Sequence, residues 1–294
     1  MPVIDAHVHL YPPEVGADPG GWAAAQGEPH WARLCTRRRR DGRAVQGFPT
    51  VAELLRAMDA AGIDRAVLLG WYWEKPDTCL WQNRFYAAAV RAHPDRFSAF
   101  ASIHAGTGPD AVAADLRQAR DAGFCGVGEL SPPAQGIAAD DPGLAQIFAT
   151  AGDLGLPVNV HVTDPQGRPY PGKIETPAND FVGWARAHPR TIFVLAHWGG
   201  RFPLTDPRFR ELPNLRYDTA ASPLLYDASI WRKMVSAVGA EKIWFGSDFP
   251  LQLYPAATDA PEMARLLAEA RAAAMPPAVL GENAARALGL AARA

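Results

Sequence analysis

Histidines and carboxylates in this sequence stand at the ends of short apolar runs. The segment Asp5-Ala6-His7-Val8-His9 carries two imidazoles two positions apart, and alternate residues of a strand share one face. Later apolar runs end in single candidate residues: Glu129, His161, His197 and Asp248. Imidazole and carboxylate donors without thiolates suit Zn²⁺, Mn²⁺ or Fe²⁺. A single histidine of this kind could equally be a hydrogen-bonded polar residue that lines the barrel. The whole set together predicts a divalent-metal site.

The elements that must position these residues alternate along the chain. Eight runs with strand character occupy residues 3–7, 65–71, 97–103, 125–130, 157–161, 191–196, 215–218 and 242–246. Amphipathic helical patterns separate them, which predicts an α/β fold, a (β/α)8 TIM barrel, as one domain over residues 1–294. A doubly wound sheet is the alternative, but it more often has a glycine-rich loop where this chain has histidines. In a barrel, the C-terminal strand ends converge on one site.

Two segments depart from a minimal barrel. The long first connection, residues 11–48, is rich in Pro, Gly, Trp and Arg, and we expect a lid-like insertion because such long loops are usually functional. Within it, the arginine run 37–40 is more typical of a solvated face than of an anion clamp. Residues 281–294 predict a short C-terminal helix packed across the barrel.

Composition excludes several classes of protein. The net charge of −2 and the pI near 6.4 give no field that attracts nucleic acid or an anionic membrane, so we expect a small-molecule substrate. Three cysteines without a CxxC pair favour neither a disulfide framework nor a thiolate zinc site. No run approaches the ~18 apolar residues of a membrane helix, and the N-terminus lacks signal-peptide features. We therefore expect a cytoplasmic protein, and a homo-oligomer is left open.

The motifs together resemble the amidohydrolase superfamily of metal-dependent hydrolases. The resemblance rests on the histidine pair of the first strand, the histidines that end the fifth and sixth strands, and Ser247-Asp248-Phe249-Pro250. The segments 92–97, 195–200 and 281–285 resemble its amidohydrolase-related (type 2) branch. That branch also contains aminocarboxymuconate-semialdehyde decarboxylase and the resorcylate decarboxylases. The resemblance covers the chain outside 11–48, and it fixes no substrate.

The resemblance implies a role for each matching residue. The implied metal ligands are His7, His9, His161 and Asp248. His197 would lie beside the metal and polarise a substrate carbonyl or orient water, while Asp248 would also carry a proton from metal-bound water to the leaving group. The chemistry is reasonable, because a divalent metal lowers the pKa of bound water to about 7. Zinc is the expected ion, with manganese or iron as alternatives.

The number of ions depends on the fourth strand. Many binuclear members carry a carboxylated lysine there, but residues 125–130 contain no lysine and Glu129 ends the run. A glutamate at this place is similar to TatD-like hydrolases, in which it bridges two metals. The alternative is a glutamate that hydrogen-bonds His161 or the substrate beside a single metal. We expect one ion rather than two, with Glu129 in the site either way.

Substrate-binding candidates are less specific. Trp71 follows the second predicted strand and suits the wall of an apolar pocket, although core packing explains it equally well. Arg168 and Arg201 follow the fifth and sixth strands and are candidates to clamp a carboxylate, although surface arginines are common.

The leading functional hypothesis is therefore a metal-dependent hydrolase of a small amide, lactone or ester that uses activated water. The alternative is a metal-dependent, non-oxidative decarboxylase of an aromatic or unsaturated carboxylic acid, because the same ligand set serves both reactions in this branch.

Overall fold

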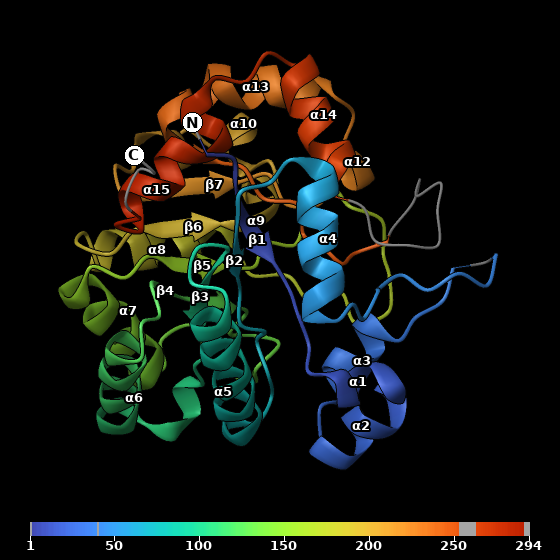
Figure 1. The fold of residues 1–294 in the computed structure, drawn as a ribbon. Coiled ribbons are helices and arrows are strands. Elements are labelled where there is room, and N and C mark those ends of the chain that lie inside the picture. The colour runs from blue at the N-terminus through green and yellow to red at the C-terminus, as the bar shows by residue number, and fades with distance from the viewer. Residues whose placement is uncertain (1, 40, 253–262, 291–294) are drawn as a thin grey trace.

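The centre of the molecule is one sheet of eight parallel strands. A computed structural model describes residues 2–39, 41–252 and 263–290 of the chain (Figure 1). The strands follow one another around the sheet in chain order. They are β1 (Ile4–Val8), β2 (Arg65–Leu68), β3 (Phe97–Ala101), β4 (Gly126–Leu130), β5 (Val158–Val160), β6 (Phe193–Leu195), β7 (Leu215–Asp218) and β8 (Ile243–Trp244). This arrangement confirms the predicted (β/α)8 barrel.

Backbone hydrogen bonds join the first strand to the chain that directly follows the last strand. Ala6 N donates to Phe245 O over 2.8 Å, and Asp248 N donates to His7 O over 2.9 Å. These bonds fix the chain beyond β8 against β1. As a result, Asp248 lies beside the histidine pair although almost the whole sequence separates them.

The second strand ends earlier than the sequence predicts. The apolar run extends to Trp71, but the ladder stops at Leu68 because side chains replace the neighbouring strand as partners. Trp71 N donates to Gln82 Oε1 over 2.8 Å, and Tyr86 Oη donates to Leu69 O over 2.8 Å. These bonds turn the chain out of the sheet toward the mouth of the barrel.

Helices cover the outside of the barrel. The longer ones are α4 (Val51–Ala61), α5 (Pro76–Ala92), α6 (Pro109–Asp121), α7 (Pro142–Leu154), α8 (Ala178–Ala187), α13 (Ser229–Val238) and α14 (Ala264–Ala272). In α4, Leu54 and Met58 are fully buried and pack in the same core as Leu68 of β2. Each such side chain contributes about 1.5–3 kcal/mol of burial free energy. Among the helices described, none has both the length and the apolar character needed to cross a bilayer.

Short helical segments occupy several connections. They are η1 (Ala105–Thr107), α9 (Ala196–Gly199), α10 (Phe202–Thr205), α11 (Arg208–Glu211), α12 (Ser222–Leu225), η2 (Ala240–Lys242), the π-helical η3 (Ala278–Glu282) and α15 (Asn283–Ala287). The C-terminal helix α15 lies within the predicted segment 281–294 and follows the π-helical turn η3. Residues 291–294 of that prediction lie outside the described residues. Ala284 and Leu288 pack with Ile4 of β1 and Trp244 of β8. This contact covers one end of the barrel.

Residues 11–48, called the insertion from here on, contain three short helices: α1 (Pro13–Ala17), α2 (Pro19–Gln26) and α3 (Pro29–Cys35) (blue in Figure 1). Together with Tyr11, they join a hydrophobic cluster that is rich in aromatic side chains. Tyr11 and Trp31 pack with Trp71 and Trp73 from the connection between β2 and α5. The insertion thus shares a hydrophobic cluster with this connection, separate from the main core.

Candidate metal centre

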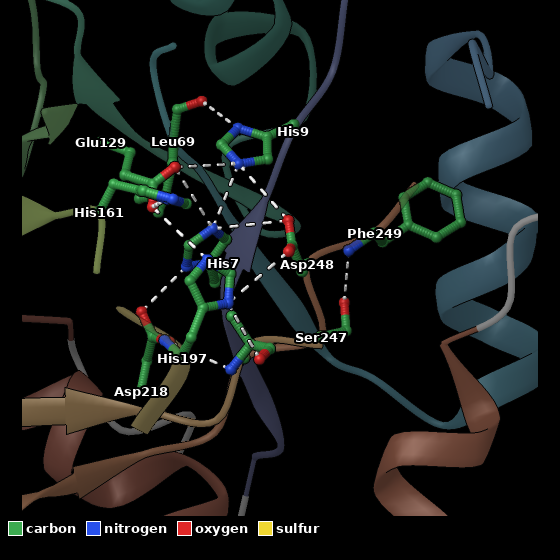
Figure 2. A network of polar contacts seen from close by, with 12 residues as sticks. His7, His9, Leu69, Glu129, His161, His197, Asp218, Ser247, Asp248 and Phe249 are labelled. Carbon is green, nitrogen blue, oxygen red and sulfur yellow. Dashed lines mark hydrogen bonds and ion pairs between the residues drawn. The ribbon is translucent and has the colours of Figure 1, made fainter. Parts of the chain in front are cut away.

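Two histidines at the C-terminal end of the first strand meet two carboxylates from distant parts of the chain (Figure 2). The Nε2 atoms of His7 and His9 lie 3.2 Å apart. Glu129 Oε2 lies 4.0 Å from His7 Nε2 and 3.6 Å from His9 Nε2. Asp248 Oδ1 lies 3.7 Å from His7 Nε2 and 3.6 Å from His9 Nε2. Four donor atoms therefore face one another at the C-terminal mouth of the barrel.

The hydrogen bonds on the far side of each ring show which nitrogen is available. His7 Nδ1 lies 2.9 Å from Asp218 Oδ2, and His9 Nδ1 lies 3.2 Å from Leu69 O. Because a carboxylate and a carbonyl oxygen only accept, each Nδ1 carries the hydrogen and each neutral ring presents a lone pair at Nε2. Lone pairs that face one another and two carboxylates need a cation between them. The donor set therefore fits a divalent metal ion.

The carboxylates around the histidines also favour a cation at this point. Burial lowers the pKa of His7, but the carboxylates of Asp218, Glu129 and Asp248 outweigh burial and raise it to about 10. The cluster therefore favours a positive charge at this point, which a proton or a metal ion supplies. Burial and the neighbouring His7 lower the pKa of His9 to about 3, so His9 is a neutral imidazole, which is the form that can bind a metal ion.

Glu129 connects this group to a second group of donors. One ligand atom each from His7, His9 and Glu129 lie within 4.8 Å of one another, and so do one each from Glu129, His161 and His197. His161 Nδ1 lies 2.9 Å from Glu129 Oε1, and His197 Nε2 lies 3.9 Å from the same oxygen. The structure thus brings all the predicted donors to one place, with Glu129 between the two groups. The number of ions stays a prediction.

The two residues expected to act in catalysis have unusual backbone conformations. The φ angles of His197 and Asp248 are 55° and 63°, a left-handed region that costs a non-glycine residue about 1–3 kcal/mol. Burial raises the pKa of Asp248 to about 7, with His7 opposing the shift and Glu129 adding to it. Burial and His161 lower the pKa of His197 to about 4. The first residue is therefore a carboxyl that can hold a proton, and the second is a neutral imidazole.

The sequence analysis missed Asp218, which supports both groups of donors. Its Oδ2 accepts from His7 and, over 2.9 Å, from Asn159 Nδ2. Its Oδ1 accepts from His197 N over 3.0 Å. Asp218 is fully buried and orients one histidine of each group. A signal was present, because Asp218 ends the seventh apolar run as the other candidates end theirs.

A cavity of about 660 Å³ opens above the donors, and His9, Glu129, His161, His197 and Asp248 line its floor. Trp71 and Tyr72 form one wall and stack with ring centroids 4.4 Å apart. The edge of Trp71 also approaches the His9 ring, at a centroid distance of 5.0 Å. Trp71 therefore lies at the predicted place, as a largely buried side chain beside the donor cluster.

The two predicted arginines also line the cavity. Arg201 Nε donates to Asp164 Oδ2 over 2.7 Å, and its guanidinium lies over the Tyr226 ring at 5.3 Å. Arg168 is exposed at the mouth. The contacts of Arg201 fix its orientation, and the binding roles of both arginines stay predictions.

The arginine run of the insertion is not uniformly solvated, so that expectation is wrong for Arg37. Its side chain lines the cavity and lies over the Tyr170 ring at 5.0 Å. Arg37 Nε donates to Leu34 O over 2.9 Å, which folds the side chain back against the end of α3. Arg38, the next residue, is exposed.

A parallel barrel with histidines and carboxylates at its C-terminal mouth is the architecture of an α/β-barrel metalloenzyme. The chain matches the amidohydrolase family model over residues 4–290. It belongs to the amidohydrolase family and is an enzyme of that superfamily.

Three known proteins illustrate what the chain is similar to. It is 25% identical over 216 residues to 2-amino-3-carboxymuconate-6-semialdehyde decarboxylase of Dictyostelium discoideum, a match covering 62% of this chain and 60% of that enzyme's length. The 5-carboxyvanillate decarboxylase structure from Sphingomonas paucimobilis has a TM-score of 0.74 at 18% identity, with 99% of both chains covered. The 5-carboxyvanillate decarboxylase from Novosphingobium aromaticivorans, solved with manganese and 4-hydroxy-3-methoxy-5-nitrobenzoic acid, gives 0.72 at 15% identity, covering 98% of this chain and 96% of that chain. The two structural matches show the shared fold.

These relatives overturn the leading functional hypothesis. Hydrolysis of an amide, lactone or ester was expected, but all three similar proteins are decarboxylases. The physical reason is that the ligand pattern specifies where a metal is held and not which bond of the bound substrate breaks. The reading as a hydrolase is therefore wrong.

Proposed function

We propose that the protein is a metal-dependent, non-oxidative decarboxylase of a small planar carboxylic acid, either aromatic or unsaturated. The relatives described above support this reaction class. In the reaction, the bond between the substrate carbon and its carboxylate breaks, and the electron pair stays on that carbon. A proton then adds to the same carbon, and CO₂ leaves. No oxidant or reductant is needed.

The observation that carries the proposal is the position of Asp248. Its carboxyl lines the cavity next to the histidine donors, and Trp71 and Tyr72 line the same cavity. A carboxyl there can hold a proton within reach of a substrate carbon and deliver it as a general acid. His197, across the floor, is placed to hydrogen-bond a substrate oxygen.

A divalent metal is the cofactor of this proposal. His7, His9, Glu129 and Asp248 would hold it, with His161 on the other side of Glu129. When bound, it would supply a Lewis acid that binds substrate oxygens and withdraws negative charge. Zinc is the expectation from sequence, while manganese accompanies the related structure from Novosphingobium aromaticivorans. A single ion is proposed.

The walls of the cavity suit a flat, anionic substrate. The stacked rings of Trp71 and Tyr72 offer an apolar surface for a planar molecule. Arg168 and Arg201 are proposed to bind a carboxylate or another anionic group. We propose a small molecule as the substrate, with neither nucleic acid nor a membrane as partner, and a cytoplasmic location. Whether the protein forms a homo-oligomer stays open.

The test is release of CO₂ from a panel of acids by the purified protein. The panel contains 5-carboxyvanillate, 2-amino-3-carboxymuconate 6-semialdehyde and hydroxybenzoates, with lactones and esters assayed in parallel. We expect CO₂ equal to the acid consumed, loss of activity after chelation, and recovery with Mn²⁺ or Zn²⁺. Metal analysis of the active protein would give the number of ions. Metal-loaded protein that releases no CO₂ from any acid in the panel would contradict the proposal.

A further inference from the structure

Two helices beside the aromatic cluster are not capped by the side chain of the residue that precedes them. Helix α3 of the insertion follows Glu28, and helix α5 of the barrel follows Lys75. Each starts with a proline, and neither preceding residue makes a capping hydrogen bond through its own side chain. The first N–H groups of a helix have no partner within it and need an outside acceptor.

Each helix start receives a carboxylate from the other segment. Glu28 accepts from Glu74 N over 2.7 Å and from Lys75 N over 3.1 Å, and the Thr78 side chain also bonds it. In return, Glu74 Oε2 accepts from His30 N over 2.6 Å. Glu28 is fully buried. The insertion and the barrel thus exchange carboxylates where α3 and α5 begin.

The two partners in this exchange are not equally anchored. The barrel already holds residues 71–73: Gln82 accepts from Trp71 N, Ser102 donates to Trp71 O and Gln135 donates to Trp73 O. Helices α1, α2 and α3 have 5, 8 and 7 residues, and helices of this length are marginal on their own. The barrel side is therefore the anchor, and the insertion is the part that depends on the exchange.

The insertion makes further contacts with the rest of the chain. His30 Nε2 lies 3.0 Å from Gly172 O, and Arg37 stacks on Tyr170, both in the connection that follows β5. Gly47 N donates to Pro250 O over 2.9 Å, near Asp248. Of these three contacts, the one made by His30 lies at the junction of α2 and α3, and the other two lie nearer the end of the insertion. At the junction, Glu28 is the charged group that bonds the barrel.

We propose that Glu28 and Glu74 are positioning residues for substrate binding. Their exchange holds α3 over the cavity, where the insertion supplies His30, Leu34 and Arg37 to the lining. Neither carboxylate lines the cavity itself, so both act through the segment they hold. The consequence for substrate affinity rests on the proposed function, whereas the consequence for the docking of α3 does not.

The experiment compares Glu28→Gln and Glu74→Gln with Glu53→Gln as the matched control. Glu53 Oε2 accepts from Thr50 N over 2.7 Å in a capping box within one segment at α4, so the control weakens the same kind of bond away from α3. Glutamine keeps the size of glutamate, but its amide nitrogen cannot accept. Hydrogen–deuterium exchange is followed in peptides covering residues 28–36, 51–61 and 126–130.

We expect both test variants to exchange about tenfold faster in residues 28–36, because the charged acceptor is replaced by a neutral amide oxygen that binds N–H groups more weakly, with residues 126–130 unchanged. The control should speed exchange only near residues 51–61. With an acid that the protein decarboxylates, KM should rise about tenfold while kcat stays within about threefold, as expected when only binding is lost. Wild-type exchange in residues 28–36 in both variants would overturn the proposal, as would a fall in kcat at constant KM.

Two further outcomes distinguish the test of the positioning role from the test of the proposed function. If Glu28→Gln does not fold, Glu74→Gln decides, because Glu74 is only partly buried and its carboxylate reaches the insertion through one backbone bond. If the protein releases no CO₂ from any acid, but residues 28–36 still open in the variants, the proposed function fails and the positioning role is supported.

Discussion

The mouth of the barrel and the insertion border the same cavity but are held in different ways. At the mouth, the donor side chains come from strand ends, and buried partners such as Asp218 fix their far sides. The insertion consists of short helices on an aromatic cluster, docked through carboxylates on backbone N–H groups. The comparison suggests a division of labour. In the proposed function, the barrel fixes the reacting groups, and the insertion shapes the space for the substrate.

The largest expected effect belongs to the barrel mouth. Asp248→Asn removes a carboxyl that can donate a proton but keeps its shape, so we expect kcat for CO₂ release to fall by about 10³-fold, within the range of general acid catalysis. The measurement is steady-state kinetics at saturating Mn²⁺. Asp206→Asn, which removes a surface partner of Arg208, serves as the control and should keep wild-type kcat. A rate near wild type in Asp248→Asn would remove Asp248 from the proposed reaction.

An intermediate effect is expected at Asp218, which hydrogen-bonds the histidine donors from behind. Asp218→Asn replaces a carboxylate that accepts from His7 and from His197 N by an amide with only one accepting atom. We expect the affinity for Mn²⁺ to fall by about 10–100-fold, as for other partners that orient metal-binding histidines. Calorimetric titration of metal-free protein measures this, again against Asp206→Asn. If affinity for the metal is unchanged and only KM for the acid moves, the division between mouth and insertion is wrong.

The smallest effect is expected in the insertion. Arg37→Met keeps much of the length of the side chain but removes the guanidinium beside the cavity, so KM for an anionic acid should rise by about tenfold with kcat unchanged. The neighbouring variant Arg38→Met provides the control, because Arg38 is exposed. Kinetics on both variants with the same acid test the claim. An equal rise in KM for both variants would mean that Arg37 acts only through its positive charge and makes no specific contact with the substrate.

Much of the fold was predictable because its signals are local. Apolar runs and helical periodicity placed all eight strands, and the barrel rule then brought His7 and Asp248 to the same mouth. The ends of strands were less predictable. The apolar run that ends at Trp71 leaves the sheet after Leu68, because side chains of α5 bind its backbone. The local sequence pattern of the run contains no information about those side chains.

The site shows the same limit. Strand-end residues such as Glu129 could be found from sequence, and Asp218 could have been found by the same rule. Glu28 could not, because its acceptor role depends on backbone groups 46 and 47 positions away. Arg37 was misjudged because its direction depends on where α3 ends. The reaction itself was misjudged, because hydrolases and decarboxylases of this superfamily share their metal ligands.

The exchange of carboxylates between Glu28 and Glu74 also bears on protein engineering. The insertion cannot be transferred alone to another barrel. Without the segment around Glu74, its third helix would be uncapped, and the barrel that it left would have an uncapped α5. A library aimed at new substrates should therefore randomise the cavity-facing positions of the insertion and keep these two glutamates as an invariant pair.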